Sequence, residues 1–134
     1  MALGCTPLRR TSECLRVVDT INSGISGIQN LSNSGRSAAV YRQIATAYEQ
    51  LGKQLGALLP KDSDLSKALA SYRDLTQRAA KHARDYSEEL AKVPEGATLE
   101  PDTQARLDRI RSAAKVELTR EASLVRKLNS LCHP

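Results

Sequence analysis

Three cysteines and two histidines are the side chains best suited to chemistry in this sequence of 134 residues. Cys5, Cys14 and Cys132 lie near the two ends of the chain, and no two of them have the spacing of zinc ligands. His82 stands alone in the middle of the chain, and His133 lies at its end. This distribution predicts no metal site and leaves pairing of two cysteines as the first chemistry to consider.

The motifs that catalysis or cofactor binding would require are missing. No nucleophile stands beside a base, and the Glu-x-x-His motif of di-iron bundles does not occur. The glycine-containing stretch 23–27 lacks the lysine and the preceding strand of a phosphate-binding loop. We therefore expect a protein that is not an enzyme and that holds no cofactor.

The charge distribution argues against nucleic acid as a partner. The formal net charge is +5 at pH 7, but basic and acidic residues alternate, as in Arg73-Asp74 and Arg84-Asp85. Such alternation is typical of a solvated helix face. The chain has no Trp or Phe on which bases would stack, and no apolar run long enough to span a membrane. The expected partner is another protein.

Hydrophobic periodicity predicts four helices and an all-α fold. Between residues 64 and 93, apolar or small residues recur at steps of three and four, which places them on one helix face. This stripe consists of Leu65, Ala68, Tyr72, Leu75, Ala79, His82, Tyr86 and Val93. A first helix is expected to start at Thr11 or Ser12 with Glu13 in its first turn, and a second to span residues 37–59.

Ser63 or Asp62 is expected to cap the third helix, and the fourth is expected to begin at Pro101, which suits a first turn. Its predicted stripe consists of Leu107, Ile110, Ala114, Leu118, Val125, Leu128 and Leu131. Gly24 and Gly27 interrupt the stripe of the first helix. They either let a neighbouring helix approach closely or loosen the helix, and we favour close approach.

Short links between the four segments predict an antiparallel up-down-up-down four-helix bundle. Residues 1–10 are expected to form a flexible tail, and residues 11–134 the bundle. In this topology the start of the first helix and the end of the fourth lie at the same end. Cys14 and Cys132 are therefore predicted to form a disulfide, which implies an oxidising compartment.

The tetrapeptide Ala2-Leu3-Gly4-Cys5 resembles the end of a lipobox, the bacterial motif in which a cysteine after a small residue receives lipid. Ala2 stands where the motif prefers Leu. The resemblance implies lipidation of Cys5 and membrane anchoring on the periplasmic side. It agrees with the predicted disulfide, which leaves Cys5 as the unpaired cysteine.

A buried polar pair is predicted between the second and third helices. Folding them about the turn near residue 61 places His82 level with Tyr41, so that a hydroxyl-to-imidazole hydrogen bond would satisfy both groups. The functional alternative at this position is a ligand-binding or proton-transfer site.

Together these features favour a periplasmic, lipid-anchored interaction or structural protein of the bacterial cell envelope. Two alternatives stay open. One is a cytoplasmic helical adaptor or chaperone-like module with reduced thiols. The other is a small-ligand sensor that holds a small polar molecule near Tyr41 and His82, which a fully packed site at that level would exclude.

Overall fold

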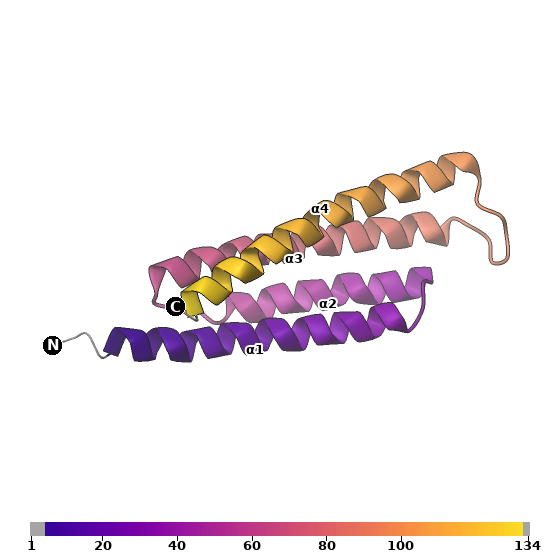
Figure 1. Ribbon diagram of the computed structural model, residues 1–134. Helices are drawn as coiled ribbons and strands as arrows, with labels where there is room; N and C mark the ends of the chain where they lie inside the picture. The colour runs from indigo at the N-terminus through magenta and orange to yellow at the C-terminus, as the bar shows by residue number, and fades with distance from the viewer. Residues whose placement is uncertain (1–4, 133–134) are drawn as a thin grey trace.

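Four helices make up the part of the chain that the structure describes. The computed structural model describes the backbone of residues 5–132 and the side chains of residues 11–132. Its helices are α1 (Cys5–Asn33), α2 (Ala38–Gly56), α3 (Ser63–Ala91) and α4 (Pro101–Cys132), and no strand occurs among these residues. The predicted all-α four-helix fold is confirmed. Figure 1 shows the helices in up-down-up-down order, with the start of α1 and the end of α4 at the same end of the molecule.

Side-chain caps set the starts of α2 and α3. The Ser37 hydroxyl accepts a hydrogen bond from the Val40 N–H at 3.2 Å. The Asp62 carboxylate accepts one from the Leu65 N–H at 2.9 Å. These bonds satisfy N–H groups that have no partner inside the helix. Asp62 is one of the two caps predicted for this helix, and Pro101 begins α4 as predicted.

The start of α1 differs from the prediction. The helix begins at Cys5 and not at Thr11 or Ser12, so residues 5–10 belong to it and not to a tail. Pro7 does not prevent this extension, because proline's missing N–H costs little within the first turn of a helix, where no acceptor precedes it.

Glu13 consequently lies well inside α1 and does not serve its first turn. Its carboxylate accepts hydrogen bonds from the backbone N–H groups of Lys61 and Asp62, the latter at 3.3 Å. Those N–H groups lie at the start of α3, where negative charge is favourable. The contact ties the first part of α1 to the turn between α2 and α3.

The central helix of the core is α3. It packs closely on α2 and α4 and only sparsely on α1. Its buried residues are Leu65, Ala68, Leu69, Tyr72, Leu75, Thr76, Ala80, Tyr86 and Ser87. The approach of α2 is close because Gly52 and Gly56 have no side chains. A Cβ atom at Gly52 would lie 2.7 Å from Oγ1 of Thr76, and one at Gly56 would lie 2.8 Å from Nη2 of Arg73.

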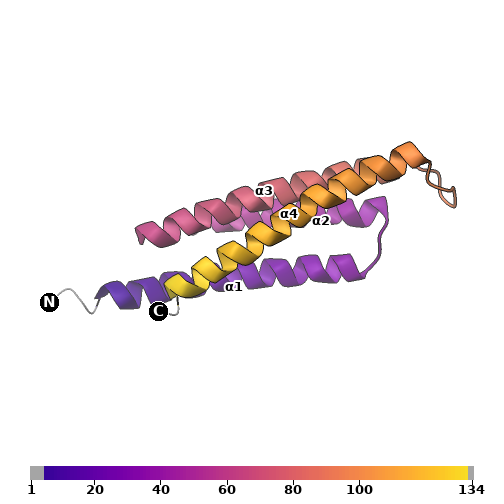
Figure 2. The ribbon, with the colours of Figure 1, turned by 45° about the horizontal axis from the view of Figure 1, so that its top comes forward.

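Packing of α4 is less complete than its predicted stripe suggests. Its buried residues are Leu107, Glu117 and Leu128, whereas Leu118, expected in the stripe, is 60% exposed. The helix packs along α3, contacts α1 sparsely and makes no close backbone contact with α2. Figure 2 shows α4 crossing the bundle diagonally, from the end of α3 towards the start of α1. The bundle is therefore closed at both ends of α4 and loose along its middle.

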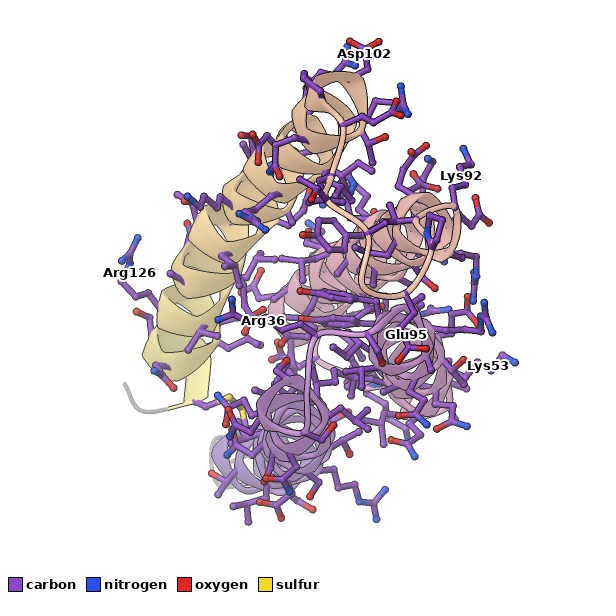
Figure 3. All side chains as sticks on the ribbon, turned by 90° about the vertical axis from the view of Figure 1, so that its right-hand side faces the viewer. Arg36, Lys53, Lys92, Glu95, Asp102 and Arg126 are labelled. Atoms are coloured by element: carbon purple, nitrogen blue, oxygen red, sulfur yellow. A yellow bond between two sulfur atoms is a disulfide. The ribbon has the colours of Figure 1, made fainter. Side chains whose placement is uncertain are left out.

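A disulfide between Cys14 and Cys132 holds the end of α4 to α1, in the pairing that the topology predicts. The two Cα atoms are 5.6 Å apart and 118 positions separate the residues in sequence. In Figure 3, which looks along the bundle from the opposite end, the yellow sulfur bond lies between the far end of α4 and α1. The start of α4, near Asp102, stands well away from α1 in the same view.

The two glycines of α1 have different surroundings. A Cβ atom at Gly24 would lie 2.6 Å from Cδ1 of Leu51, a fully buried residue of α2, whereas one at Gly27 would meet nothing within 4 Å. The predicted close approach of a neighbouring helix therefore holds at Gly24 and not at Gly27.

Alanine substitutions at these glycines should change stability in different ways. Gly27→Ala should raise the free energy of unfolding by about 0.5–1 kcal/mol, because alanine is the better helix former. Gly24→Ala gains the same propensity but must displace Leu51, which costs about 1–3 kcal/mol. We expect Gly24→Ala to be at least about 1 kcal/mol less stable than Gly27→Ala in urea denaturation. Equal stability of the two variants would contradict the close contact.

Removal of the disulfide should weaken the fold substantially. The double variant Cys14→Ala/Cys132→Ala should lose about 2–4 kcal/mol of unfolding free energy, because the unfolded chain is no longer closed into a long loop. Denaturation without reductant measures this loss, and Cys5→Ser is the control that should behave as the wild type. Reductant should lower the unfolding free energy of the wild type to that of the double variant. If it has no effect, the bond is absent.

Candidate ligand-binding cavity

A cavity of about 280 Å³ lies between the middle of α4 and the other three helices. Its walls are mainly apolar and include Ile28 from α1, Ile44 from α2, Leu75 and Ala79 from α3, and Ile110 and Ala114 from α4. It arises because α4 follows α3 and makes no close backbone contact with α2. The space opens to solvent, since exposed Ser32, Arg111 and Leu118 are among its lining residues, and a recess of this size with mainly apolar walls is a candidate site.

Tyr41 and His82, the predicted polar pair, both line this cavity. Each is only partly buried, and no hydrogen bond joins them among the described residues. The ring of Tyr41 packs instead on Tyr86, with centroids 4.5 Å apart and planes tilted by 49°. Both residues line one cavity, but the ring contact of Tyr41 is with Tyr86, one helical turn further along α3 than His82.

Tyr86 in turn connects α3 to α4. Nη2 of Arg111 donates a hydrogen bond to the Tyr86 hydroxyl at 2.7 Å, and the guanidinium carbon lies 5.8 Å from the ring centroid. This geometry combines a charge-assisted hydrogen bond with a cation–π contact. A second contact nearby is the ion pair of Arg106 with Glu89, at 3.0 Å. Together they fix the first half of α4 beside the cavity.

Glu117 is a buried carboxylate on the α4 wall, with 6% of its surface exposed. Both of its oxygens accept hydrogen bonds from Nε of Arg78 on α3 at 3.1 Å, and Oε1 accepts another from Nη1 of Arg120 at 3.0 Å. Two guanidinium groups thus compensate one buried charge, which otherwise would destabilise the fold strongly. Glu117 serves as a bridge between α3 and α4.

Glu121, one turn further along α4, has a different environment. It also lines the cavity and is half-buried, yet it forms no ion pair among the described residues. Its neighbours are the tyrosines Tyr48 of α2 and Tyr72 of α3. The Tyr72 hydroxyl is fully buried and close enough to interact with the charge of Glu121. It has no hydrogen-bond partner of normal geometry in the described part of the chain.

The pKa values of Glu121, Tyr48 and Tyr72 are all raised. Burial raises the pKa of Glu121, although the nearby Tyr72 hydroxyl favours the ionised form and offsets part of the shift. Burial raises the pKa of Tyr48 to about 12, and the charge of Glu121 adds to the effect. Burial, followed by the charge of Glu121, also raises the pKa of Tyr72. Each shift has the same main origin, the removal of water from a charged form.

Other site types receive no support from the described residues. They contain no group of three or more His, Cys, Asp or Glu side chains placed to hold a metal ion. None of their helices is long and apolar enough to cross a membrane. Ala2, Leu3, Gly4, the Cys5 side chain and His133 lie outside the described residues and side chains. Lipidation of Cys5 therefore stays a prediction.

Glu117 and Glu121 are site residues that the periodicity argument missed. Steps of three and four from Ala114 lead to 117 and 121 on the face that carries Leu107 and Leu128. Leu118 was assigned to the predicted stripe because it is apolar, but it lies on the neighbouring face, which is exposed. The sequence signal that could have identified them is their spacing, because both carboxylates fall on the same helix face as the buried leucines.

Comparison with known proteins found no matching family model, no similar curated protein and no similar solved structure. The functional conclusion therefore rests on the geometry of the cavity and its lining.

A pH titration of stability tests the environment of Glu121. Because burial raises its pKa in the folded state, the ionised form destabilises the fold as pH rises above the ordinary carboxyl range. The unfolding free energy of the wild type should therefore fall, relative to that of Glu121→Gln, between about pH 4 and 7. Urea denaturation at several pH values measures the difference. Other titratable groups are common to both proteins and cancel, so a pH-independent difference would contradict the assignment.

Proposed function

We propose that the protein is a non-enzymatic binding protein whose site is the cavity beneath α4. The observation that carries the proposal is an apolar cavity of about 280 Å³ into which a few polar groups converge. Small-molecule sites typically have mainly apolar walls, a few polar groups and volumes of about 300–1,000 Å³, so this cavity suits a small ligand. The small-ligand alternative required space near Tyr41 and His82, and both residues line the cavity.

Binding without catalysis is supported by the chemistry of the lining. Ser32 is its one hydroxyl on an aliphatic side chain and His82 its one imidazole, but no hydrogen bond joins the two among the described residues. A nucleophile needs such a base within reach. The carboxylate of Glu117 is already compensated by Arg78 and Arg120, which suits a structural role better than proton transfer.

The proposed setting is the bacterial cell envelope. A disulfide between α1 and α4 is supported by the placement of Cys14 and Cys132, and such bonds persist in oxidising compartments such as the periplasm. The lipobox-like segment before Cys5 supports a lipid anchor in the same compartment. The cytoplasmic alternative requires the fold to persist with both thiols reduced.

Docking of another protein is a second candidate function. It is favoured by exposed apolar side chains near the disulfide end of the bundle: Leu15 is 58% exposed and Leu59 is 79% exposed. Leu59 also has a φ of 43°, a conformation that non-glycine residues rarely adopt. These residues lie outside the cavity, so a variant that fills the cavity separates the two functions.

Filling the cavity should abolish binding of a small aromatic probe. Ala114→Phe places a ring in the space beneath α4, and we expect the affinity for phenethyl alcohol to fall at least about tenfold. Ala122→Phe, on an exposed position of the same helix, is the matched control and should bind as the wild type does. Calorimetric titration measures binding, and circular dichroism checks the fold. Unchanged binding by folded Ala114→Phe would rule out the cavity as the site.

A further inference from the structure

The two carboxylates that line the cavity differ in how they are compensated. Glu117 accepts hydrogen bonds from Arg78 and Arg120, and its charge is balanced within the protein. Glu121 lines the same wall one turn away and has no cationic partner among the described residues. A half-buried carboxylate without a counter-charge is costly, because burial removes part of its water and the nearby Tyr72 hydroxyl supplies no charge to replace it.

The hydroxyl of Tyr72 lies beside Glu121 but does not balance its charge. It is completely buried and favours the ionised form of the carboxylate, although it has no hydrogen bond of normal geometry in the described part of the chain. A hydroxyl supplies no charge, and Tyr72 is not among the residues that line the cavity. Glu121 is therefore the group that can meet a ligand and that still lacks a counter-charge.

The walls around these groups suit a cation with an apolar body. Three tyrosines, Tyr41, Tyr48 and Tyr86, contribute to the lining, and the faces of aromatic rings attract ammonium groups. The remaining lining is mainly aliphatic and would cover a hydrocarbon body. An ammonium group donates hydrogen bonds and carries the charge that Glu121 lacks.

We propose that the ligand is a small amphipathic amine, whose ammonium group pairs with Glu121 while its apolar body fills the space beneath α4. This inference rests on the proposed binding function and names the chemical class of the ligand. Glu121 supplies the charge and accepts a hydrogen bond, and the ring of Tyr48, which also lines the cavity, lies beside the bound cation.

An amphipathic anion fits the same space less well. Its acidic group would have to pair with Arg111, which lines both the cavity and the adjoining hollow, or with Arg36, which lines the hollow. Both are exposed to solvent, and Arg111 already bonds to Tyr86, so their attraction is screened by water. The tail of such a ligand would then reach towards the uncompensated carboxylate of Glu121, which favours a cation and not a hydrocarbon end.

Three probes that share one phenylethyl skeleton test this inference on the full chain with its disulfide intact. They are phenethylamine, phenethyl alcohol and hydrocinnamate, which carry an ammonium, a hydroxyl and a carboxylate. Calorimetric titration at neutral pH and low salt should show the amine binding at least about tenfold more tightly than the alcohol, with the carboxylate weakest. Equal affinities of amine and alcohol, or tighter binding of the carboxylate, would overturn the proposed ligand class.

Variants locate the effect at Glu121. Glu121→Gln should lower the affinity for the amine to about that of the alcohol and leave the alcohol unchanged. Glu95→Gln removes the same charge from the exposed loop between α3 and α4 and should leave both affinities unchanged. An equal loss in both variants would show a long-range charge effect and refute the direct pairing.

The outcomes also separate this inference from the proposed function. If the alcohol binds the wild type but not Ala114→Phe, and the amine binds no more tightly than the alcohol, the cavity is a binding site and the ligand is not a cation. If none of the three probes binds, the binding function and the ligand class are both refuted.

Discussion

Attachment of α4 to two different helices is the constraint on which the rest of the structure depends. Near its start Arg111 holds the helix to Tyr86 of α3, and at its end a covalent bond joins Cys132 to Cys14 of α1. Between these points α4 contacts α1 sparsely and makes no close backbone contact with α2. Because a helix is stiff, one fastened to two different neighbours crosses the space between them without filling it. The cavity is a consequence of this diagonal course.

The same course explains why two carboxylates one turn apart differ in character. Glu117 lies where α4 still runs close to α3, so Arg78 reaches it. Glu121 lies further along and meets the hydroxyl groups of Tyr48 and Tyr72, which remove water without supplying charge. Small differences in the distance between helices thus convert one acid into a structural bridge and leave the other available to a ligand.

Much of the fold was predictable from the sequence because each signal was local. Steps of three and four marked the helices, Asp62 and Pro101 marked two helix starts, and short links indicated antiparallel neighbours. The pairing of Cys14 with Cys132 followed from topology alone, since an even number of antiparallel helices returns the chain to its starting end. The start of α1 was missed, because residues 1–10 were expected to form a tail, whereas Pro7 permits a helix in its first turn.

The site was less predictable, because it depends on rotation and tilt of helices and not on their order. Counting residues from the turn brought Tyr41 and His82 to one level, but an offset of one helical turn along α3 makes Tyr86 the contact. On α4 the neighbouring positions 117 and 118 were both candidates for the inner face, and the apolar Leu118 was chosen although Glu117 is the buried residue. Only partners on another helix, above all Arg78, make an inward carboxylate favourable, and a single-helix pattern contains no information about them.

The disulfide also makes the described chain almost a closed ring. Cys14 and Cys132 are joined across 118 positions, and the three links between helices all lie within that ring. A proteolytic cut in the exposed segment 94–100 would therefore leave every helix covalently connected, in the connectivity of a circular permutant with new ends at the opposite pole. The cut protein would keep its assembled form, because the disulfide still joins α1 to α4.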